Sequence, residues 1–425
     1  MGVRSRLPTA IRNGAEWARR FARTAPGVLS AVVVGLVALS VISGLVCANQ
    51  LSEKLTRRDT VLTHSEPLAN AAQRLYVALS AADATASSAF LSGNVESPDV
   101  RTRYRQALAD AAAALAEATT GASDQQTRDI VANISADLPT YTGLVEAARA
   151  NNRQGLPVGS AYLRQASALM QNSVLPDAER LQKNRLTHLR DDQRDISTLP
   201  LLSVILLLVL LLAFVAGSVV LLRHTNRRIN LGVGTAAGAT VLALLWIVIA
   251  SIAATGVIDT GSDGATARFE TLSRIRILAQ QARTEETLQL IIRGDINDSE
   301  NRFGTKVNEL SDHLTTVTDA NSPAATAFST WQAGHNTEVK AYQANDYNGA
   351  VTQAIGGAPG SSATRFAALD DALRTELDTT RQQVRDGVDG AGGAFQLSQF
   401  GTLLLLIAAA AATAGGIWPR LKEFL

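Results

Sequence analysis

Side chains that could carry out catalysis or hold a metal are few and widely separated in this 425-residue chain. The five histidines are His64, His188, His224, His313 and His335. No two of them have metal-ligand spacing, and none lies in a sequence typical of a nucleophile with its base. The single cysteine, Cys47, excludes an internal disulfide framework and a cysteine-based zinc site. We therefore expect no catalytic residue, no metal, no cofactor and no enzymatic activity.

The stretch GVGTAAG at 232–238 has glycines spaced like those of a dinucleotide-binding loop. It follows no strand, however, and it opens an apolar segment, which disfavours a phosphate-binding role. Gly234 and Gly238 instead form a small-xxx-small pattern, which predicts close packing of membrane helices.

Four apolar segments without charged residues interrupt the chain. They cover residues 28–49, 199–222, 231–258 and 400–418. Each reaches the roughly 20 residues that a helix needs to cross a bilayer, and a backbone without water must form helices there. Because no charged side chain lies inside these segments, an ion or proton pathway is disfavoured, and so is a transporter.

Positive charge is concentrated next to these four segments. The N-terminal segment 1–27 has six arginines and one acid, the link 223–230 contains Arg223, Arg227 and Arg228, and the tail 419–425 contains Arg420 and Lys422. Positive flanking segments are cytoplasmic as a rule. We therefore predict a multi-pass cell-membrane protein with both termini cytoplasmic and with residues 50–198 and 259–399 outside.

The formal net charge of the whole chain is only +1, which gives no indication of nucleic-acid binding. The longest predicted cytoplasmic segment has 27 residues, too few for a catalytic domain.

The two long segments have the composition and periodicity of helices. Apolar residues repeat at heptad spacing in both. The repeats are Leu68, Ala72, Leu75, Leu79, Ala82, Ala86 and Ala89, and later Phe366, Leu369, Leu373, Leu377, Val384 and Val388. Breaks at 92–98, 119–124 and 151–159, and at 295–298, 319–323 and 345–360, divide each segment into four helices. The predicted fold is all-α, with four transmembrane helices and two tandem four-helix bundles.

The order of features indicates an internal duplication, because each half reads as apolar segment, long segment and apolar segment. Tyr141 and Trp331 open corresponding stretches, and the helix ending near Gly93 has a counterpart near Gly294. Glu285-Glu286 breaks the apolar spacing of the second copy. This pair is either a buried polar contact or the sign of a rotated helix face, and the rotated face is the preferred interpretation.

Each long segment resembles the four-helix-bundle sensory domains of chemoreceptors and membrane histidine kinases, on a pattern that includes Tyr141 and Leu175-Pro176. In those receptors, arginines of the first helix hold ligand carboxylates. The resemblance implies that Arg74, Arg274 and Arg276 contact a ligand or partner, although a solvated helix face is the simpler interpretation. A homodimer is compatible with this layout.

Two cytoplasmic features could transmit a signal. The N-terminal segment predicts an amphipathic helix that lies on lipid or docks a partner through Trp17, Arg19, Arg20 and Phe21. The eight-residue link with Arg223, Arg227 and Arg228 joins the two halves, so movement in one half must reach the other. Together with Arg420 and Lys422, these arginines are the candidate output residues.

The layout of the whole chain, with its arginine-rich hairpin and short tail from Gly416 to Glu423, is similar to that of the GlnX family of actinobacterial membrane proteins. That resemblance implies three partners: an external amino-acid-binding lipoprotein, the cytoplasmic serine/threonine protein kinase G, and the lipid bilayer. The implied function is a signal relay by helix displacement. A membrane scaffold and a direct small-molecule receptor are the alternatives.

Overall fold

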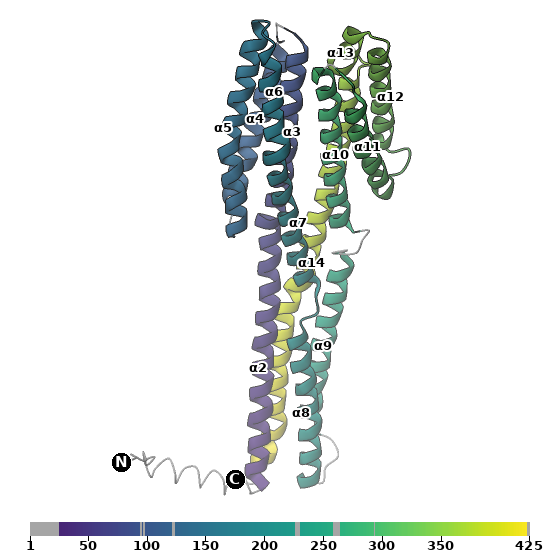
Figure 1. Cartoon of the computed structure of the whole chain (residues 1–425). Coiled ribbons are helices and arrows are strands. Elements are labelled where there is room, and N and C mark those ends of the chain that lie inside the picture. Colours follow the sequence, from purple (N-terminus) through teal and green to yellow (C-terminus); the bar gives the residue numbers. More distant parts are fainter. Residues whose placement is uncertain are drawn as a thin grey trace, which may run out of the picture. The chain divides into compact units, whose positions relative to one another are not determined.

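The structure is a computed structural model, and it describes residues 25–93, 96, 98–120, 124–225, 230–257, 264–292 and 294–422. Nearly all of these residues are helical and none of them lies in a strand, which confirms the predicted all-α class (Figure 1). The chain divides into two compact units. One, here called the membrane unit, comprises residues 1–59, 194–258 and 388–425; the other, the helical unit, comprises 60–193 and 259–387.

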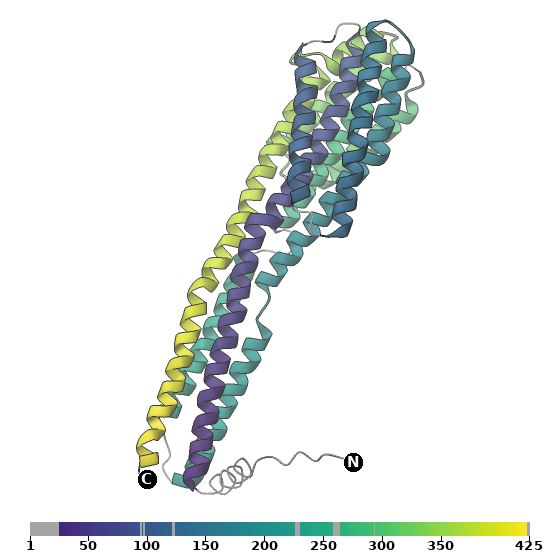
Figure 2. The same ribbon diagram turned by 90° about the vertical axis from the view of Figure 1, so that its left-hand side faces the viewer.

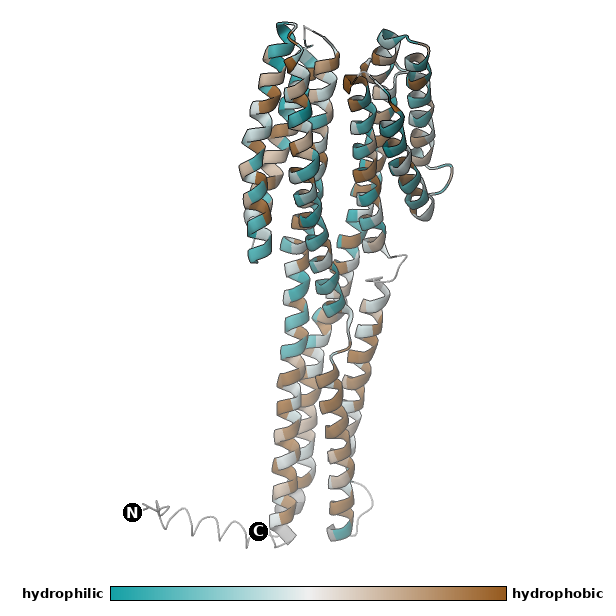
Figure 3. Ribbon diagram, viewed as in Figure 1, coloured by the Kyte–Doolittle hydropathy of each residue, from teal (hydrophilic) through white to brown (hydrophobic). Residues whose placement is uncertain are grey.

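Among the described residues, four helices are long and apolar enough to cross a membrane, as a multi-pass membrane protein requires. Their apolar portions lie in α2 (Ala25–Thr60), α8 (Leu201–Thr225), α9 (Leu231–Val257) and the C-terminal part of α14 (Ser362–Lys422). Figure 3 shows the hydrophobic residues concentrated along these portions. Large aliphatic side chains such as Leu212 and Ile249 are exposed on them, as expected for side chains that meet lipid.

The four apolar helices run alongside one another within the membrane unit (Figures 1 and 2). Glycines mark several of their contacts: Gly44 of α2 faces Leu406 of α14, and Gly217 of α8 faces Leu36 of α2. Several serine and threonine hydroxyls between the helices bond within their own helix, as Thr240 Oγ1 does to the Ala236 carbonyl, whereas Ser203 Oγ of α8 donates to Gln50 Oε1 of α2 at 2.5 Å. Small residues and internally satisfied hydroxyls therefore let these helices pack closely.

Lys54 of α2 caps the helix that precedes α8. Its Nζ donates to the backbone carbonyls of Asp195, Ile196 and Thr198, at 3.0, 2.8 and 2.5 Å, around the C-terminus of α7 (Leu175–Ser197). A cation is favourable there because the last carbonyls of a helix lack partners within it. This contact ties α2 to the junction between α7 and α8.

In the helical unit, the first half consists of α3 (Glu66–Leu91), α4 (Pro98–Thr120), α5 (Gln125–Arg153), α6 (Val158–Leu169) and most of α7. The second half consists of α10 (Ala265–Ile292), α11 (Asn297–Val317), α12 (Pro323–Gln343), α13 (Tyr347–Ile355) and the N-terminal part of α14. The break predicted at 345–360 thus contains the short helix α13. Gly93 ends α3 with a φ of 92°, the left-handed conformation that glycine adopts without strain.

Both predicted heptad seams are mostly buried. In α3 and α14 only Leu68 and Phe366 of the seam residues are partly exposed. α3 and α10, however, are buried on more than one face, because they also pack against each other. Ile277 and Ile291 of α10 belong to the same apolar core as the first half, and Gln281 Nε2 donates to the Tyr76 hydroxyl at 2.7 Å. Helix α10 therefore contributes to the core of the first half, while Leu290, Ala350 and Ala354 form a separate small core in the second half.

Two π-helical turns adjoin α-helices of the first half. They cover Val61–Ser65, between α2 and α3, and Met170–Val174, between α6 and α7. Each lies two residues before a proline, Pro67 and Pro176. Proline lacks the N–H that an α-helix would use and its ring crowds the preceding turn, so a locally wider helix accommodates it. The same local feature thus precedes both the first helix of this bundle, α3, and its last, α7.

Candidate functional site

The three arginines predicted to contact a ligand are all engaged in ion pairs within the helical unit. Arg74 pairs with Glu117 of α4. Arg274 donates to Glu179 at 2.5 Å and to Glu309 at 2.9 Å. Arg276 makes a two-pronged contact with Asp370 of α14, through Nε at 2.8 Å and Nη2 at 2.9 Å.

Arg74 and Arg276, but not Arg274, line one cavity, which we call the arginine cavity. Its volume is about 280 Å³. Its lining comes from α3, α4, α10 and α14, namely Asn70, Gln73, Arg74, Glu117, Phe269, Arg276, Arg374, Leu377, Asp378 and Arg381. Four guanidinium groups and two carboxylates in so small a volume make it strongly polar. The structure therefore brings two of the three predicted arginines together and adds Arg374 and Arg381.

Two groups in the arginine cavity have unused hydrogen-bonding capacity. The Gln73 side-chain nitrogen is buried without a partner, and Gln73 as a whole is only 3 % exposed. Arg374 makes no ion pair with any described residue. A buried amide left without a partner is unfavourable by about 1–3 kcal/mol. A small ligand that carries a carboxylate would satisfy both groups.

A second, larger cavity of about 950 Å³ lies between α3, α4, α10, α13 and α14. Its lining mixes apolar residues such as Val351 and Phe366 with charged ones such as Arg103, Arg283 and Asp371. Arg283 connects this cavity to a group of charged residues in the interior of the second half.

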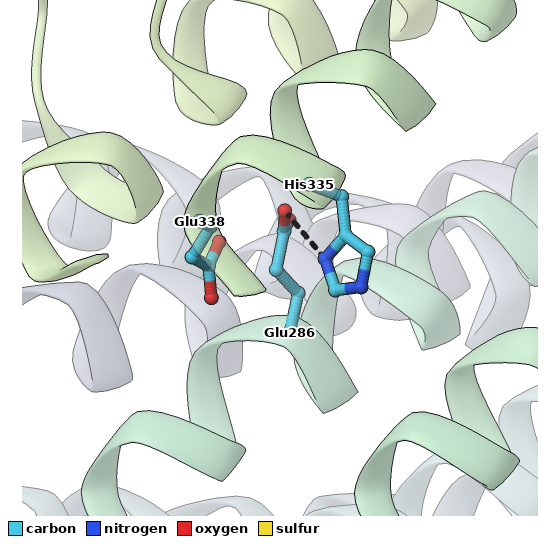
Figure 4. Close-up of side chains that lie close together, drawn as sticks. All are labelled: Glu286, His335 and Glu338. Atoms are coloured by element: carbon cyan, nitrogen blue, oxygen red, sulfur yellow. Dashed lines mark hydrogen bonds and ion pairs between the residues drawn. The ribbon is translucent and has the colours of Figure 1, made fainter. Parts of the chain in front are cut away.

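That interior group, here called the buried charge cluster, is centred on Glu286 of α10, which is 0 % exposed. Arg283 and the Ser362 hydroxyl donate to its carboxylate, as do Trp331 Nε1 at 3.3 Å and His335 Nδ1 at 3.2 Å. Figure 4 shows Glu286 and His335 side by side, with Glu338 facing them. Burial alone would raise the pKa of Glu286, but Arg283 and His335 outweigh it and lower that pKa to about 2.

His335 is held on both ring nitrogens and on one face. Its Nε2 lies 3.3 Å from a Glu300 oxygen, and the Phe303 ring stacks on the imidazole with a centroid distance of 3.7 Å. Burial opposes the charged ring, yet the bonds to Glu286 and Glu300 raise the pKa of His335 to about 10. The ring is therefore a cation with a fixed orientation.

Glu338, one turn after His335 on α12, is far less well satisfied. It is 0 % exposed, and its only hydrogen bond among the described residues comes from Gln289 Nε2, at 3.1 Å. Its other oxygen, Oε2, has no partner, and neither has Gln289 Oε1. Burial and the neighbouring Glu286 charge raise the pKa of Glu338 well above its usual value.

The first half has a simpler counterpart of this cluster. Asp83 of α3 is 0 % exposed and accepts from the Tyr141 hydroxyl at 3.3 Å, Ser167 Oγ at 2.9 Å and Gln171 Nε2 at 3.2 Å. Burial raises the pKa of Asp83 more than these three bonds lower it. In both halves, then, a carboxylate on the first helix accepts from an aromatic donor on the third helix and from a serine hydroxyl, Ser167 of α6 or Ser362 of α14.

The preferred interpretation of Glu285-Glu286, a rotated helix face, is wrong. The Glu285-Glu286 pair does not mark a rotated face: Glu286 is a buried polar contact, while Glu285 pairs with Arg302 at the surface. Glu300, His335 and Glu338 were not singled out as a group. Their proximity depends on which helices pack together, which residue spacing within one helix does not reveal.

The remaining predicted site residues lie in or beside the membrane unit. Arg223 is exposed near the end of α8, and Arg420 and Lys422 fall in the last turn of α14. Arg227, Arg228, Trp17, Arg19, Arg20 and Phe21 lie outside the described residues. No described atom of another helix would come within 4 Å of a Cβ at Gly234 or Gly238. The close contact of α9 is made instead by Gly232, whose added Cβ would lie 2.5 Å from the Gly416 Cα of α14.

Residues 57–194 match the family model of the actinobacterial sensor domain. This range begins in the last turn of α2 and includes the whole first half of the helical unit. Comparison with curated proteins and with solved structures found no match. The sensor domain and the four apolar helices indicate a membrane sensor protein.

Proposed function

We propose that this chain relays an extracellular signal across the membrane and that both halves of its helical unit lie outside the cell. The observation that carries the proposal is the place of the sensor domain in the chain. Its match starts in α2 and ends in α7, three residues before that helix ends and shortly before α8. A sensor domain joined at both ends to apolar helices can pass a displacement into the membrane. The arginines beside these helices support the cytoplasmic placement of their other ends.

We infer that the second half is a duplicated sensor domain. The support is the shared arrangement around Asp83 and Glu286, with Tyr141 and Trp331 as corresponding aromatic donors. Its last helix, α14, continues without interruption from Ser362 to Lys422, so it also joins a sensor half directly to an apolar segment.

The proposed partners are an external amino-acid-binding lipoprotein of the glutamate, aspartate or glutamine type and a cytoplasmic serine/threonine kinase. Because a partner can shift the helices only if it binds one arrangement better than another, the occupied binding protein must prefer one state of the helical unit. A pull-down with the full chain in detergent, with and without glutamate or aspartate, tests this relay. Capture that depends on the amino acid supports it, whereas capture that does not supports a scaffold.

The cytoplasmic link gives a direct test of signal output. Replacing Arg223, Arg227 and Arg228 together by glutamine is expected to abolish the dependence of kinase phosphorylation on the external amino acid, because the link joins α8 to α9. The matched variant with three lysines keeps the charge that sets topology and is expected to signal more strongly than the glutamine variant. Full signalling by the glutamine variant, with its topology verified by cysteine labelling, would remove the link as the output point.

A second candidate function, direct binding of a small carboxylate ligand, is favoured by the arginine cavity. Arg374 and Gln73 both have free donors there, and Glu117 and Asp378 could receive a ligand ammonium group. Arg374→Gln is expected to weaken binding of such a ligand at least tenfold, since a charged hydrogen bond contributes about 1.5–3 kcal/mol. Calorimetry of the full chain with glutamate and aspartate measures this. The control Arg365→Gln removes an arginine of α14 that does not line the cavity; equal effects of both variants would contradict the assignment.

A further inference from the structure

Glu338 is the one carboxylate of the buried charge cluster without a cationic partner among the described residues. Arg283 and His335 both direct their donors at Glu286, and His335 also donates to Glu300. Glu338 receives one neutral donor, and its Oε2 is bare although the residue is 0 % exposed. A buried carboxylate oxygen in this position calls for a proton, a bound water or a metal ion, because desolvation without compensation is strongly unfavourable.

The groups around Glu338 form a ligand set with suitable geometry. One ligand atom each from Glu286, His335 and Glu338 can be chosen so that all three atoms lie within 4.8 Å of one another, and all three residues are buried. His335 and Glu338 are three positions apart on α12, which places them on the same helix face, and Glu286 comes from α10. Figure 4 shows the three side chains next to one another, with Glu286 between Glu338 and His335. One imidazole nitrogen with two carboxylates is a donor set used by zinc and other first-row divalent ions.

The surroundings of His335 are also those of a metal-binding histidine. Its Nδ1 faces the Glu286 carboxylate at 3.2 Å, while Nε2 is held by Glu300 at 3.3 Å. Histidine ligands usually donate their second ring N–H to such an outer carboxylate, which fixes the ring and makes the coordinating nitrogen a better ligand. Phe303, stacked on the imidazole, prevents the ring from turning.

We propose that Glu286, His335 and Glu338 bind a divalent transition-metal ion that links α10 to α12 in the second half of the helical unit. The overall charge of the cluster allows a divalent ion to replace two protons. A divalent ion would take the place of one proton on His335 and one on Glu338, while Arg283 stays paired with Glu286. The binding would thus bury no additional net charge. Asp83 in the first half has only neutral donors and no second carboxylate, so no metal is proposed there.

Zinc is the probe for the test. The full chain in detergent is stripped with a chelator, equilibrated with a range of free Zn²⁺ concentrations at pH 7.5 and analysed for bound metal. We expect one high-affinity zinc per chain. Glu338→Gln, which removes a ligand but keeps the side-chain volume, is expected to weaken binding at least tenfold, the lower end of what altered metal surroundings produce. Glu285→Gln, next to the site but paired with Arg302, and Asp83→Asn are expected to bind as the wild type does.

The wild-type measurement alone can overturn the proposal. Absence of stoichiometric zinc from the folded wild-type chain contradicts it, whatever the variants do. Equal binding by wild type, Glu338→Gln and Glu285→Gln also contradicts it, because the metal would then lie elsewhere. Circular dichroism of each variant shows whether lost binding reflects lost fold, and His335→Gln provides a second loss-of-ligand variant if Glu338→Gln does not fold.

Discussion

Replacing Glu286 by glutamine is expected to destabilise the second half of the helical unit by about 3–5 kcal/mol, the usual effect of removing one partner from a buried ion pair. Arg283 and His335 would remain in the interior without the Glu286 carboxylate, and both would be poorly hydrated, since their side chains are only 6 % and 4 % exposed. The glutamine side chain would in addition place its NH₂ group against groups that themselves donate, such as Arg283 and Trp331, so that these donors would oppose one another. The lost stability therefore comes mainly from leaving Arg283 and His335 charged and unpaired in the interior, and less from the missing attraction to Glu286.

Hydrogen–deuterium exchange of the full chain in detergent measures this locally. Peptides from α10 and α12 are expected to exchange faster by about two orders of magnitude or more, because each 1.4 kcal/mol changes the opening equilibrium tenfold. Glu285→Gln is the matched control: its pair with Arg302 involves a half-exposed guanidinium and is worth less than about 1 kcal/mol. Similar exchange in both variants would show that Glu286 is not the electrostatic centre of this half.

The sequence was sufficient for the class of fold because helix formation depends on short-range spacing. Leu75, Leu79 and Ala82 lie on one buried stripe of α3, and Leu369, Leu373 and Val388 lie on one of α14, as their heptad spacing predicts. The four apolar helices follow equally directly, since length and composition decide whether a helix can cross a bilayer.

The contact between α3 and α10 could not be predicted in the same way. A heptad stripe predicts one buried face, whereas α10 buries residues as different as Ile277, Arg283 and Glu286 on several faces. Such burial all around a helix shows only that it has neighbours on every side. Which neighbours they are depends on packing between segments about 200 residues apart, here Tyr76 with Gln281.

The buried charge cluster escaped prediction for a related reason. The residues next to each member in the sequence are of the kind found on exposed helix faces. Glu286, for example, follows Glu285, which does lie near the surface. The chain reveals the cluster only after α10, α11 and α12 are packed. The one signal in the sequence was Glu286 itself, a charged residue at a position where the spacing calls for an apolar one, and such a residue indicates a buried polar contact.

Raising the pH from about 6.5 to 10 is expected to destabilise the second half of the helical unit. The folded-state pKa of His335 is about 10, above the ordinary value near 6.5, so the folded chain holds a proton that the unfolded chain releases in this range. The stability that His335 provides is complete below pH 6.5 and disappears as the pH rises through 10. The raised pKa of Glu338 acts in the same direction, beginning at the lower pH where an unfolded glutamate ionises.

Since each pKa unit corresponds to about 1.4 kcal/mol, the raised pKa of His335 corresponds to a loss of stability on the order of 3–5 kcal/mol between pH 6.5 and 10. Hydrogen exchange of α10 and α12 in the chelator-treated, metal-free chain, corrected for the intrinsic effect of pH on exchange, measures this loss. Helices α4 and α5 of the first half serve as internal references. His335→Gln, which cannot titrate, is expected to be less stable at pH 6.5 and to show a much flatter dependence on pH. A dependence that is as steep in this variant as in the wild type would assign the effect to other groups. A flat wild-type profile would mean that the ring is neutral in the folded chain, and Glu286 would then have only Arg283 to balance its charge.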